Sequence, residues 1–206
     1  MLARLFVLAG VNGAGKSSVG GAAIQASGAE FFNPDIAAAR LREQQRALTA
    51  EQANGLAWTL GRRGLEKALA EGLTYAFETT LGGASITRLL LEGARAGAEV
   101  HVWFAGLATP ELHLRRIAAR VAAGGHDIPE AKVRERFDAS RSNLVKLMPH
   151  LASLRVYDNS LEADPRAGKR PRPVLLLHMQ AGRVVAHAAL NVIPAWAKPL
   201  LAAALR

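Results

Sequence analysis

Short apolar runs alternate along the chain with longer segments compatible with helices. The run 5–9 is apolar and partly β-forming, and a T-x-x-Q capping pattern at Thr49 and Gln52 predicts a long helix that Gly72 ends. The predicted strands cover residues 4–9, 30–33, 73–78, 99–105 and 154–157, followed by a hairpin of 174–180 and 183–187. The predicted helices cover residues 16–26, 36–47, 49–71, 85–96, 110–123 and about 127–148, and a short apolar helix ends the chain.

The first turn between a predicted strand and a predicted helix carries the clearest chemical signal. Residues 10–17 read Gly-Val-Asn-Gly-Ala-Gly-Lys-Ser, a complete match to G-x-x-x-x-G-K-[ST]. The glycines allow backbone N–H groups to converge on phosphate oxygens at a helix N-terminus. We expect Lys16 to reach the β- and γ-phosphates of ATP and the Ser17 hydroxyl to bind Mg²⁺. The expected nucleotide-binding residues of this loop are Gly10, Asn12, Gly13, Ala14, Gly15, Lys16, Ser17 and Ser18.

The order of elements predicts an α/β fold. Strands that alternate with helices form a parallel sheet with both faces covered. We expect a three-layer αβα P-loop NTPase fold with a mainly parallel five-stranded sheet, a helical lid at about 110–148, and a C-terminal β-hairpin and helix at about 174–206. The whole chain, 1–206, is expected to form a single domain.

Composition narrows the possible partners only in part. The net charge is +9, and arginine supplies 20 of the 26 basic residues. This bias could serve phosphate groups of nucleotides or nucleic acid, or it could reflect arginine at solvated positions, and the sequence leaves both open. The chain has no cysteine, which excludes disulfides and thiolate metal sites and fits the cytoplasm. The apolar segment 193–205 is too short to span a bilayer, so we expect no membrane segment.

Polar residues follow the predicted strands, and ligands bind beyond the carboxyl ends of such strands. Asp35 and Glu78 are informative because a carboxylate beside a triphosphate is repelled by it, which suggests a functional role for these acids. Asp35 is the candidate base for phosphoryl transfer. Glu78 would position the acceptor or a metal-bound water, and Thr79 is expected to contact the acceptor. The alternatives are that Asp35 caps the following helix and that Glu78 pairs with an arginine.

Arginines cluster on both sides of Gly124-Gly125. Two helices joined by a glycine hinge and carrying arginines resemble a lid that closes over phosphates. The alternative is a solvated face that pairs with neighbouring acids. The arginines concerned are Arg115, Arg116, Arg120, Arg134, Arg136 and Arg141.

With these motifs assembled, the chain resembles the zeta-toxin-like family of small P-loop kinases, and more closely the bacterial branch often labelled predicted ABC-type ATPases. The resemblance covers most of the chain, and the run from Arg120 through Gly124-Gly125-His126 to Arg136 is its most specific part. It rests on GVNGAGKSS at 10–18, FFNPDIAA at 31–38, FETTLGG at 77–83, LATPELHLRRIAARVAAGGHDIPEAKVRERFDASRSNL at 107–144 and VYDNS at 156–160.

The resemblance implies a kinase that uses ATP and Mg²⁺. Toxins of this family phosphorylate the 3′-hydroxyl on the amino sugar of UDP-N-acetylglucosamine and are restrained by a small helical antitoxin. Asp35 matches the catalytic aspartate after the second strand, and Glu78 matches the acid that helps to hold the acceptor sugar. Asn159 matches the position where the last strand approaches the adenine.

The lid arginines are carried over in the same way. Arg120 and Arg136 are the expected counterparts, and the helix spacing leaves Arg134 as an alternative. The leading hypothesis is therefore an ATP-dependent kinase that acts on a hydroxyl of a nucleotide sugar or a similar metabolite. Such a kinase could be the toxin of a toxin–antitoxin pair.

A protein of another class remains an alternative. The chain has no acid after Asp164 but seven basic residues, which could mark a nucleotide-gated nucleic-acid-binding protein or a polynucleotide kinase. These residues are Arg166, Lys169, Arg170, Arg172, Arg183, Lys198 and Arg206.

Overall fold

A computed structural model describes residues 1–26, 28–29, 31–161 and 172–206. One seven-stranded sheet runs through the described part, in the order β2-β3-β1-β4-β5-β6-β7. The strands from β2 to β5 in this order pair in parallel, and β6 and β7 add antiparallel pairs at one edge. The strands are β1 (Arg4–Ala9), β2 (Phe31–Phe32), β3 (Thr74–Thr79), β4 (Glu99–Gly106), β5 (Ser153–Asp158), β6 (Val174–Gln180) and β7 (Arg183–His187).

The α/β fold with a mainly parallel sheet is therefore confirmed. The five predicted parallel strands are present, and the predicted hairpin does not stand apart but extends the same sheet to seven strands. The predicted strand 30–33 is shorter, because β2 covers only Phe31–Phe32, and Glu30 lies outside the described residues. Residues 164–171 of the predicted link also lie outside them.

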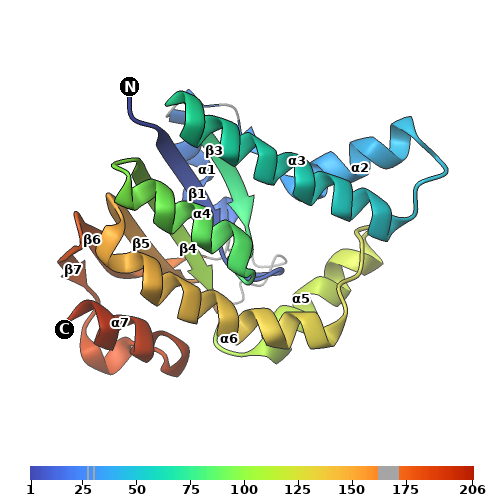
Figure 1. Cartoon of the computed structure of the whole chain (residues 1–206). Coiled ribbons are helices and arrows are strands. Elements are labelled where there is room, and N and C mark those ends of the chain that lie inside the picture. Colours follow the sequence, from blue (N-terminus) through green and yellow to red (C-terminus); the bar gives the residue numbers. More distant parts are fainter. Residues whose placement is uncertain (27, 30, 162–171) are drawn as a thin grey trace.

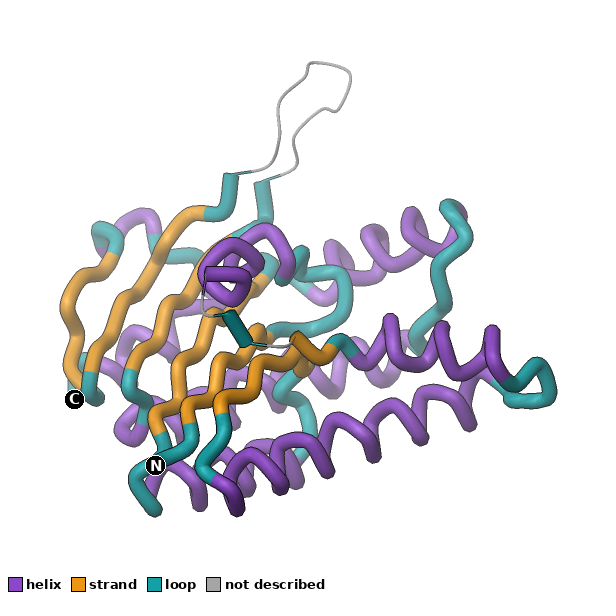
Figure 2. The backbone as a smooth tube through the Cα atoms, turned by 90° about the horizontal axis from the view of Figure 1, so that it is seen from above, coloured by secondary structure: helices purple, strands orange, loops and turns teal. Residues whose placement is uncertain are grey.

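Helices cover both faces of this sheet (Figures 1 and 2). In the described part of the chain, no helix has the length and apolar character needed to cross a membrane. The helices are α1 (Ser17–Ala26), α2 (Pro34–Gln44), α3 (Ala50–Glu71), α4 (Ala84–Arg95), α5 (Pro110–Ala122), α6 (Glu130–Leu147) and α7 (Lys198–Ala204), with short 3₁₀ turns at Met148–His150, Leu190–Val192 and Ala195–Ala197.

Strand β1 lies inside the sheet between β3 and β4, and after Arg4 its residues are all apolar and buried. Phe6 and Leu8 pack on one face with Ile24 of α1 and Trp103 of β4. The alternate residues of β1 join the larger core on the other face, which includes Leu65 of α3. Because a strand buried on both faces has no solvent side, it reads as a continuous apolar run.

Two helix pairs extend beyond the sheet (Figure 1). Helices α2 and α3 pack against each other through Ala38, Ala53 and Ala57. Helices α5 and α6 form the second pair, joined by residues 123–129. The arrangement matches the expected helical lid at 110–148 in position, while its movement and the single-domain assignment stay predictions.

The start of α2 differs from the predicted helix 36–47. The helix begins at Pro34 because the Asn33 side chain accepts hydrogen bonds from the Asp35 and Ile36 N–H groups. Pro34 occupies the first helical position, where a missing N–H is harmless. Asn33 therefore caps α2, and the Asp35 carboxylate is not the cap.

The predicted capping box of α3 is present. Thr49 Oγ1 accepts from the Gln52 N–H at 3.2 Å, and Gln52 Oε1 accepts from the Thr49 N–H at 2.9 Å. We expect Thr49→Ala to lower the free energy of unfolding by about 1 kcal/mol, because it leaves a helix N–H group without its cap. Urea unfolding followed by circular dichroism measures this change. Thr49→Ser, which keeps the acceptor oxygen, is the control and should stay close to the native value.

Candidate active site

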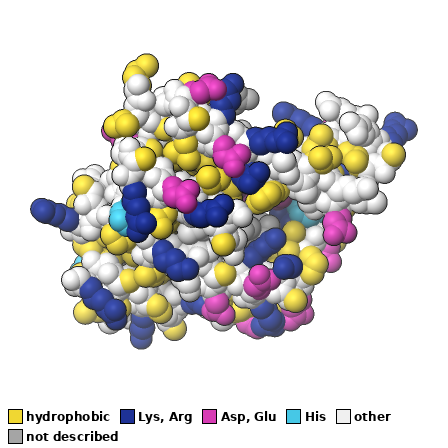
Figure 3. Space-filling view, in the orientation of Figure 1, with side chains coloured by type: hydrophobic (Ala, Val, Ile, Leu, Met, Phe, Trp, Pro, Cys, Tyr) yellow, Lys and Arg dark blue, Asp and Glu magenta, His cyan; other side chains and the backbone are white. Residues whose placement is uncertain are grey.

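A cavity of about 400 Å³ opens beyond the carboxyl ends of β1, β2 and β3. Its walls come from the loop after β1, from the start of α2, from α3, from the segment after β3 and from α6. Figure 3 shows the surface hollowed between the α2/α3 pair and α6. The charged residues that line the cavity are Lys16, Asp35, Arg62, Glu78, Lys132, Glu135 and Arg136, together with His126.

The loop at residues 10–17 has the backbone geometry of a phosphate cradle. Gly10, Gly13 and Gly15 have φ values of +138°, +81° and +71°, which side chains rarely tolerate. A Cβ atom at Gly10 would lie 2.2 Å from the Ala105 carbonyl oxygen, and one at Gly15 would lie 2.4 Å from Asn159 Nδ2. The glycines are therefore required by close packing of the loop on the ends of β4 and β5.

Lys16 is buried at the end of this loop and is paired with an acid. Its Nζ lies 3.1 Å from Glu78 Oε1, and only 7% of the lysine side chain and 16% of the glutamate side chain are exposed. Glu78 also accepts a hydrogen bond from Asn33 Nδ2 at 3.1 Å. The register explains this contact, since Phe32 of β2 lies opposite Phe77 of β3 and the next residues come side by side.

Asp35 projects from the first turn of α2 into the cavity lining. Arg120 Nη1 donates to Asp35 Oδ2 at 3.4 Å, and His126 Nε2 lies 3.8 Å from Asp35 Oδ1. Arg120 Nη2 also donates to the His126 carbonyl oxygen at 3.2 Å. Arg120 therefore joins the end of α5, the residues after Gly124-Gly125 and the carboxylate of Asp35.

Helix α6 reaches the phosphate loop through Arg136. Its Nη1 donates to Asn12 Oδ1 at 2.9 Å. Nearby, Val11 of the loop is buried against Ile117 of α5 and Val133 of α6. The two lid helices are thus packed onto the loop by an apolar cluster and tied to it by a hydrogen bond.

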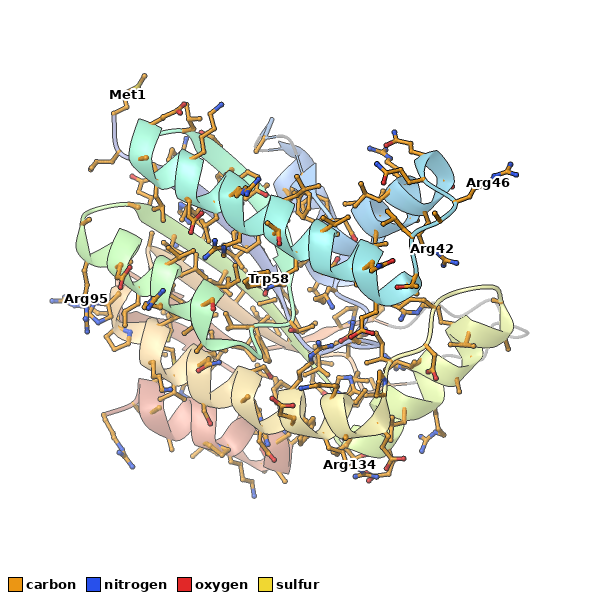
Figure 4. All side chains as sticks on the ribbon, turned by 45° about the vertical axis from the view of Figure 1, so that its right-hand side comes forward. Met1, Arg42, Arg46, Trp58, Arg95 and Arg134 are labelled. Atoms are coloured by element: carbon orange, nitrogen blue, oxygen red, sulfur yellow. The ribbon has the colours of Figure 1, made fainter. Side chains whose placement is uncertain are left out.

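The structure does not bring Arg134 to the cavity. Its guanidinium lies 2.7 Å from Glu111 Oε1 and 2.8 Å from Glu130 Oε1, on the outer side of α5 and α6 (Figure 4). Arg141 is also occupied elsewhere, because it donates to the Phe137 and Trp196 carbonyl oxygens. Of the arginines expected in the lid, Arg136 lines the cavity and Arg120 contacts Asp35, and their roles in phosphate transfer stay predictions.

Asn159 lies behind the phosphate loop. Its Nδ2 donates to the Ala14 carbonyl oxygen at 2.9 Å, and its own carbonyl oxygen accepts from Arg116 Nη2 at 2.9 Å. The side chain is buried, and in the described part of the chain its Oδ1 has no hydrogen-bond partner. Asn159 thus supports the loop, and contact with an adenine stays a prediction.

His113 of α5 supports the loop from the other side. Its Nδ1 lies 2.8 Å from the Asn12 carbonyl oxygen, so this nitrogen carries the proton and donates. Burial lowers the pKa of His113 to about 4, although the hydrogen bond to Asn12 opposes the change. The positive charges of Lys16 and Arg116 also lower the pKa of His113, so the imidazole is neutral at pH 7.

The residues fit a nucleoside triphosphate with Mg²⁺. The glycine conformations, the buried lysine and the start of α1 at Ser17 supply a cradle for phosphates. Ser17 and Ser18 are exposed at this helix start. Ser17 stays the expected protein ligand of Mg²⁺, and phosphate oxygens and water molecules would complete its shell.

The sequence did not predict the roles of three residues near the cavity: Asn33 as the cap of α2, Trp58 as a lining residue and His113 as a support of the phosphate loop. Asn33 could have been found from the Asn-Pro pair that precedes a helix, a typical capping signal. Trp58 belongs to no motif in the sequence, and in the structure it is 47% exposed and lines the cavity. His113 has no sequence signal, because its contact with the loop joins residues about 100 positions apart.

The lowered pKa of His113 predicts an acid-sensitive fold. The unfolded chain binds a proton near pH 6.5 and the folded chain only near pH 4, so stability is full above pH 6.5 and falls as the pH drops toward 4. Between pH 7.5 and pH 5, we expect this histidine to account for a loss of about 2 kcal/mol in the free energy of unfolding. Urea unfolding at both pH values measures it. His113→Gln should remove most of this pH dependence, and an equally steep dependence in that variant would contradict the assignment.

Comparison with known proteins places these features in context. Residues 5–147 match the model of the AAA domain family. An uncharacterized protein of Haemophilus influenzae is 36% identical over 70 residues, which is 34% of this chain and half of the relative.

Solved structures share the fold at low identity. The AvrRxo1-ORF1:-ORF2 structure with ATP superposes with a TM-score of 0.65 and 18% identity, over 90% of this chain and 60% of that chain. The structure of the PezAT toxin-antitoxin system of Streptococcus pneumoniae superposes with a TM-score of 0.51 and 15% identity, over 83% of this chain and 75% of that one. The chain thus spans half to three fifths of the first two proteins. Because the family model matches more than half of the chain and covers its phosphate loop, this chain belongs to the AAA domain family.

Proposed function

We propose that this protein is an ATP-dependent phosphotransferase that transfers the γ-phosphate of ATP to a hydroxyl group of a small acceptor. One observation carries the proposal: the lysine of the phosphate loop, Lys16, and the carboxylate Asp35 line the same cavity. A phosphate-binding cation and a proton acceptor that line one cavity are what phosphoryl transfer to a hydroxyl requires.

Each side chain has a distinct task in this proposal. Lys16 binds the phosphates, and Asp35 orients the acceptor hydroxyl and accepts its proton. Arg120 and Arg136 supply positive charge at the lid side of the cavity, where charge develops during transfer. Bound ATP and Mg²⁺ supply the phosphoryl group and its charge neutralisation, and Ser17 would hold the metal.

The existing contacts show which rearrangements binding demands. Lys16 is now paired with Glu78, and Arg120 is now paired with Asp35. Phosphate oxygens would compete for both cations. Release of Asp35 from Arg120 would leave the carboxylate available as a base, and Glu78 would be left to bind the acceptor together with Thr79.

The acceptor that we propose is a nucleotide sugar such as UDP-N-acetylglucosamine, as the resemblance to zeta toxins implies. The fold shared with the PezAT toxin-antitoxin system supports a small antitoxin as a partner, whereas the choice of acceptor rests on the sequence resemblance alone. Nucleic acid as a partner stays a prediction, because part of the basic C-terminal segment, residues 166–170, lies outside the described residues. The cytoplasm as the place of action also stays a prediction.

The proposal predicts a separation of turnover from ATP binding. We expect Asp35→Asn to lower the rate of labelled γ-phosphate transfer by about 10²- to 10⁴-fold, because the variant lacks the proton acceptor. The dissociation constant for ATP, measured by calorimetry, should stay within about threefold of native. The acceptor panel contains UDP-sugars, nucleoside diphosphates, simple sugars and oligonucleotides.

Two further variants give this experiment its controls. Lys16→Met removes the phosphate-binding cation and should abolish both transfer and ATP binding. Asp138→Asn alters an exposed carboxylate that pairs with Arg141 and should behave as native. Full activity of Asp35→Asn would overturn the assignment of the base, and ATP binding without transfer to any acceptor would overturn the proposed reaction.

A further inference from the structure

Trp58 differs from the other two tryptophans of the chain. Trp103 and Trp196 are buried, with 7% and 3% exposure, whereas Trp58 is 47% exposed. It lies on the side of α3 that faces the middle of the molecule and lines the cavity (Figure 4). A single exposed apolar residue on a surface needs no explanation, but one inside a cavity with Lys16 and Asp35 is placed to touch what binds there.

The position of Trp58 is set by its helix. Ala53 and Ala57 are buried against α2, which fixes the rotation of α3. The face of α3 next to them is turned to the cavity and supplies four lining residues, Asn54, Trp58, Gly61 and Arg62. This spacing corresponds to one face of a helix. The aromatic wall therefore belongs to a rigid element and not to a mobile loop.

The Trp58 ring makes a cation–π contact with Arg62. The Arg62 guanidinium carbon lies 5.6 Å from the centroid of the ring, and Arg62 Nη1 lies 3.5 Å from Glu66 Oε1. Within the described residues, Arg62 Nε is buried and has no hydrogen-bond partner. An arginine held by an acid and placed over a tryptophan ring restricts the ring, which makes it a preformed surface for stacking.

Two more aromatic side chains continue this wall. Phe32 of β2 lies opposite Phe77 of β3 in the sheet, and both line the cavity. The Phe32 ring packs closely on Gly61 of α3, because a Cβ atom at Gly61 would lie 2.7 Å from this ring. The cavity thus has an aromatic part along α3 and a charged part that contains Lys16 and Asp35.

We propose that Trp58 determines acceptor specificity by stacking on a planar heteroaromatic ring of the acceptor. The acceptor then carries a nucleobase-like ring that lies on Trp58, and its reacting hydroxyl lies at Asp35. Arg62 is a positioning residue that acts through the orientation of Trp58. This inference rests on the proposed function, since it concerns the acceptor side of the same site.

Tryptophan fluorescence tests the proposal without any turnover. The ATP site is first saturated with a non-hydrolysable ATP analogue, and the protein is titrated with UDP-N-acetylglucosamine, the four nucleoside diphosphates, or N-acetylglucosamine 1-phosphate. We expect quenching by at least one ring-bearing compound and none by the sugar phosphate. Trp58→Phe should still bind in calorimetry but lose the quenching, because its two remaining tryptophans are buried.

Affinity provides the second readout. Trp58→Ala should raise the dissociation constant of the ring-bearing compound about 10- to 100-fold, the scale of base stacking on an aromatic side chain, while ATP affinity is unchanged. Leu60→Ala, at an exposed position of α3 outside the cavity lining, should bind as native. Equal affinity for the sugar phosphate, no binding of any ring-bearing compound, or native affinity of Trp58→Ala would each overturn the proposal.

The two proposals fail in distinguishable ways. Ring-dependent binding without phosphate transfer would overturn the phosphotransferase reaction and leave the stacking role of Trp58 in place. Transfer to an acceptor without a ring, with an unchanged KM in Trp58→Ala, would overturn the stacking role and leave the reaction in place.

Discussion

The buried ion pair between Lys16 and Glu78 is the contact on which the candidate site depends. A buried lysine needs a partner, because an uncompensated charge away from water is costly. Glu78 supplies it from the end of β3 and at the same time accepts from Asn33. Asn33 caps α2 and so sets the direction of the turn that carries Asp35. The phosphate loop and the turn that carries Asp35 are therefore coupled through the side chains of Lys16, Glu78 and Asn33.

A second set of contacts joins the phosphate loop to α5 and α6. Val11 packs with Ile117 and Val133, and His113 and Arg136 bind the two oxygens of Asn12. The loop is thus in contact with both α5 and α6. Movement of α5 and α6 would alter the loop directly, because the same residues that close the cavity also support the backbone that binds phosphate.

Much of the fold could be predicted from local patterns. The loop motif, the capping box at Thr49 and the alternation of strands with helices are determined by neighbours in sequence, and each is present in the structure. The start of α2 was misplaced because an Asn-Pro pair competes with Asp35 for the capping role. The hairpin was expected, but its continuation of the parallel sheet depends on pairing of β6 with β5.

The sequence by itself determined the phosphate loop, the class of fold and the acids that end the strands, because these follow from short-range spacing and from the rule that parallel strands end at one edge. Only the tertiary structure decided which arginines of α5 and α6 lie at the cavity. Arg120 reaches Asp35 across 85 residues, while Arg134, two residues before Arg136 on α6, faces Glu111 outside the cavity. Helix rotation separates these arginines, and that rotation is set by packing of Val133 and Ile117 on the loop. The same reason applies to Trp58, whose place in the cavity follows from the packing of α3 on α2.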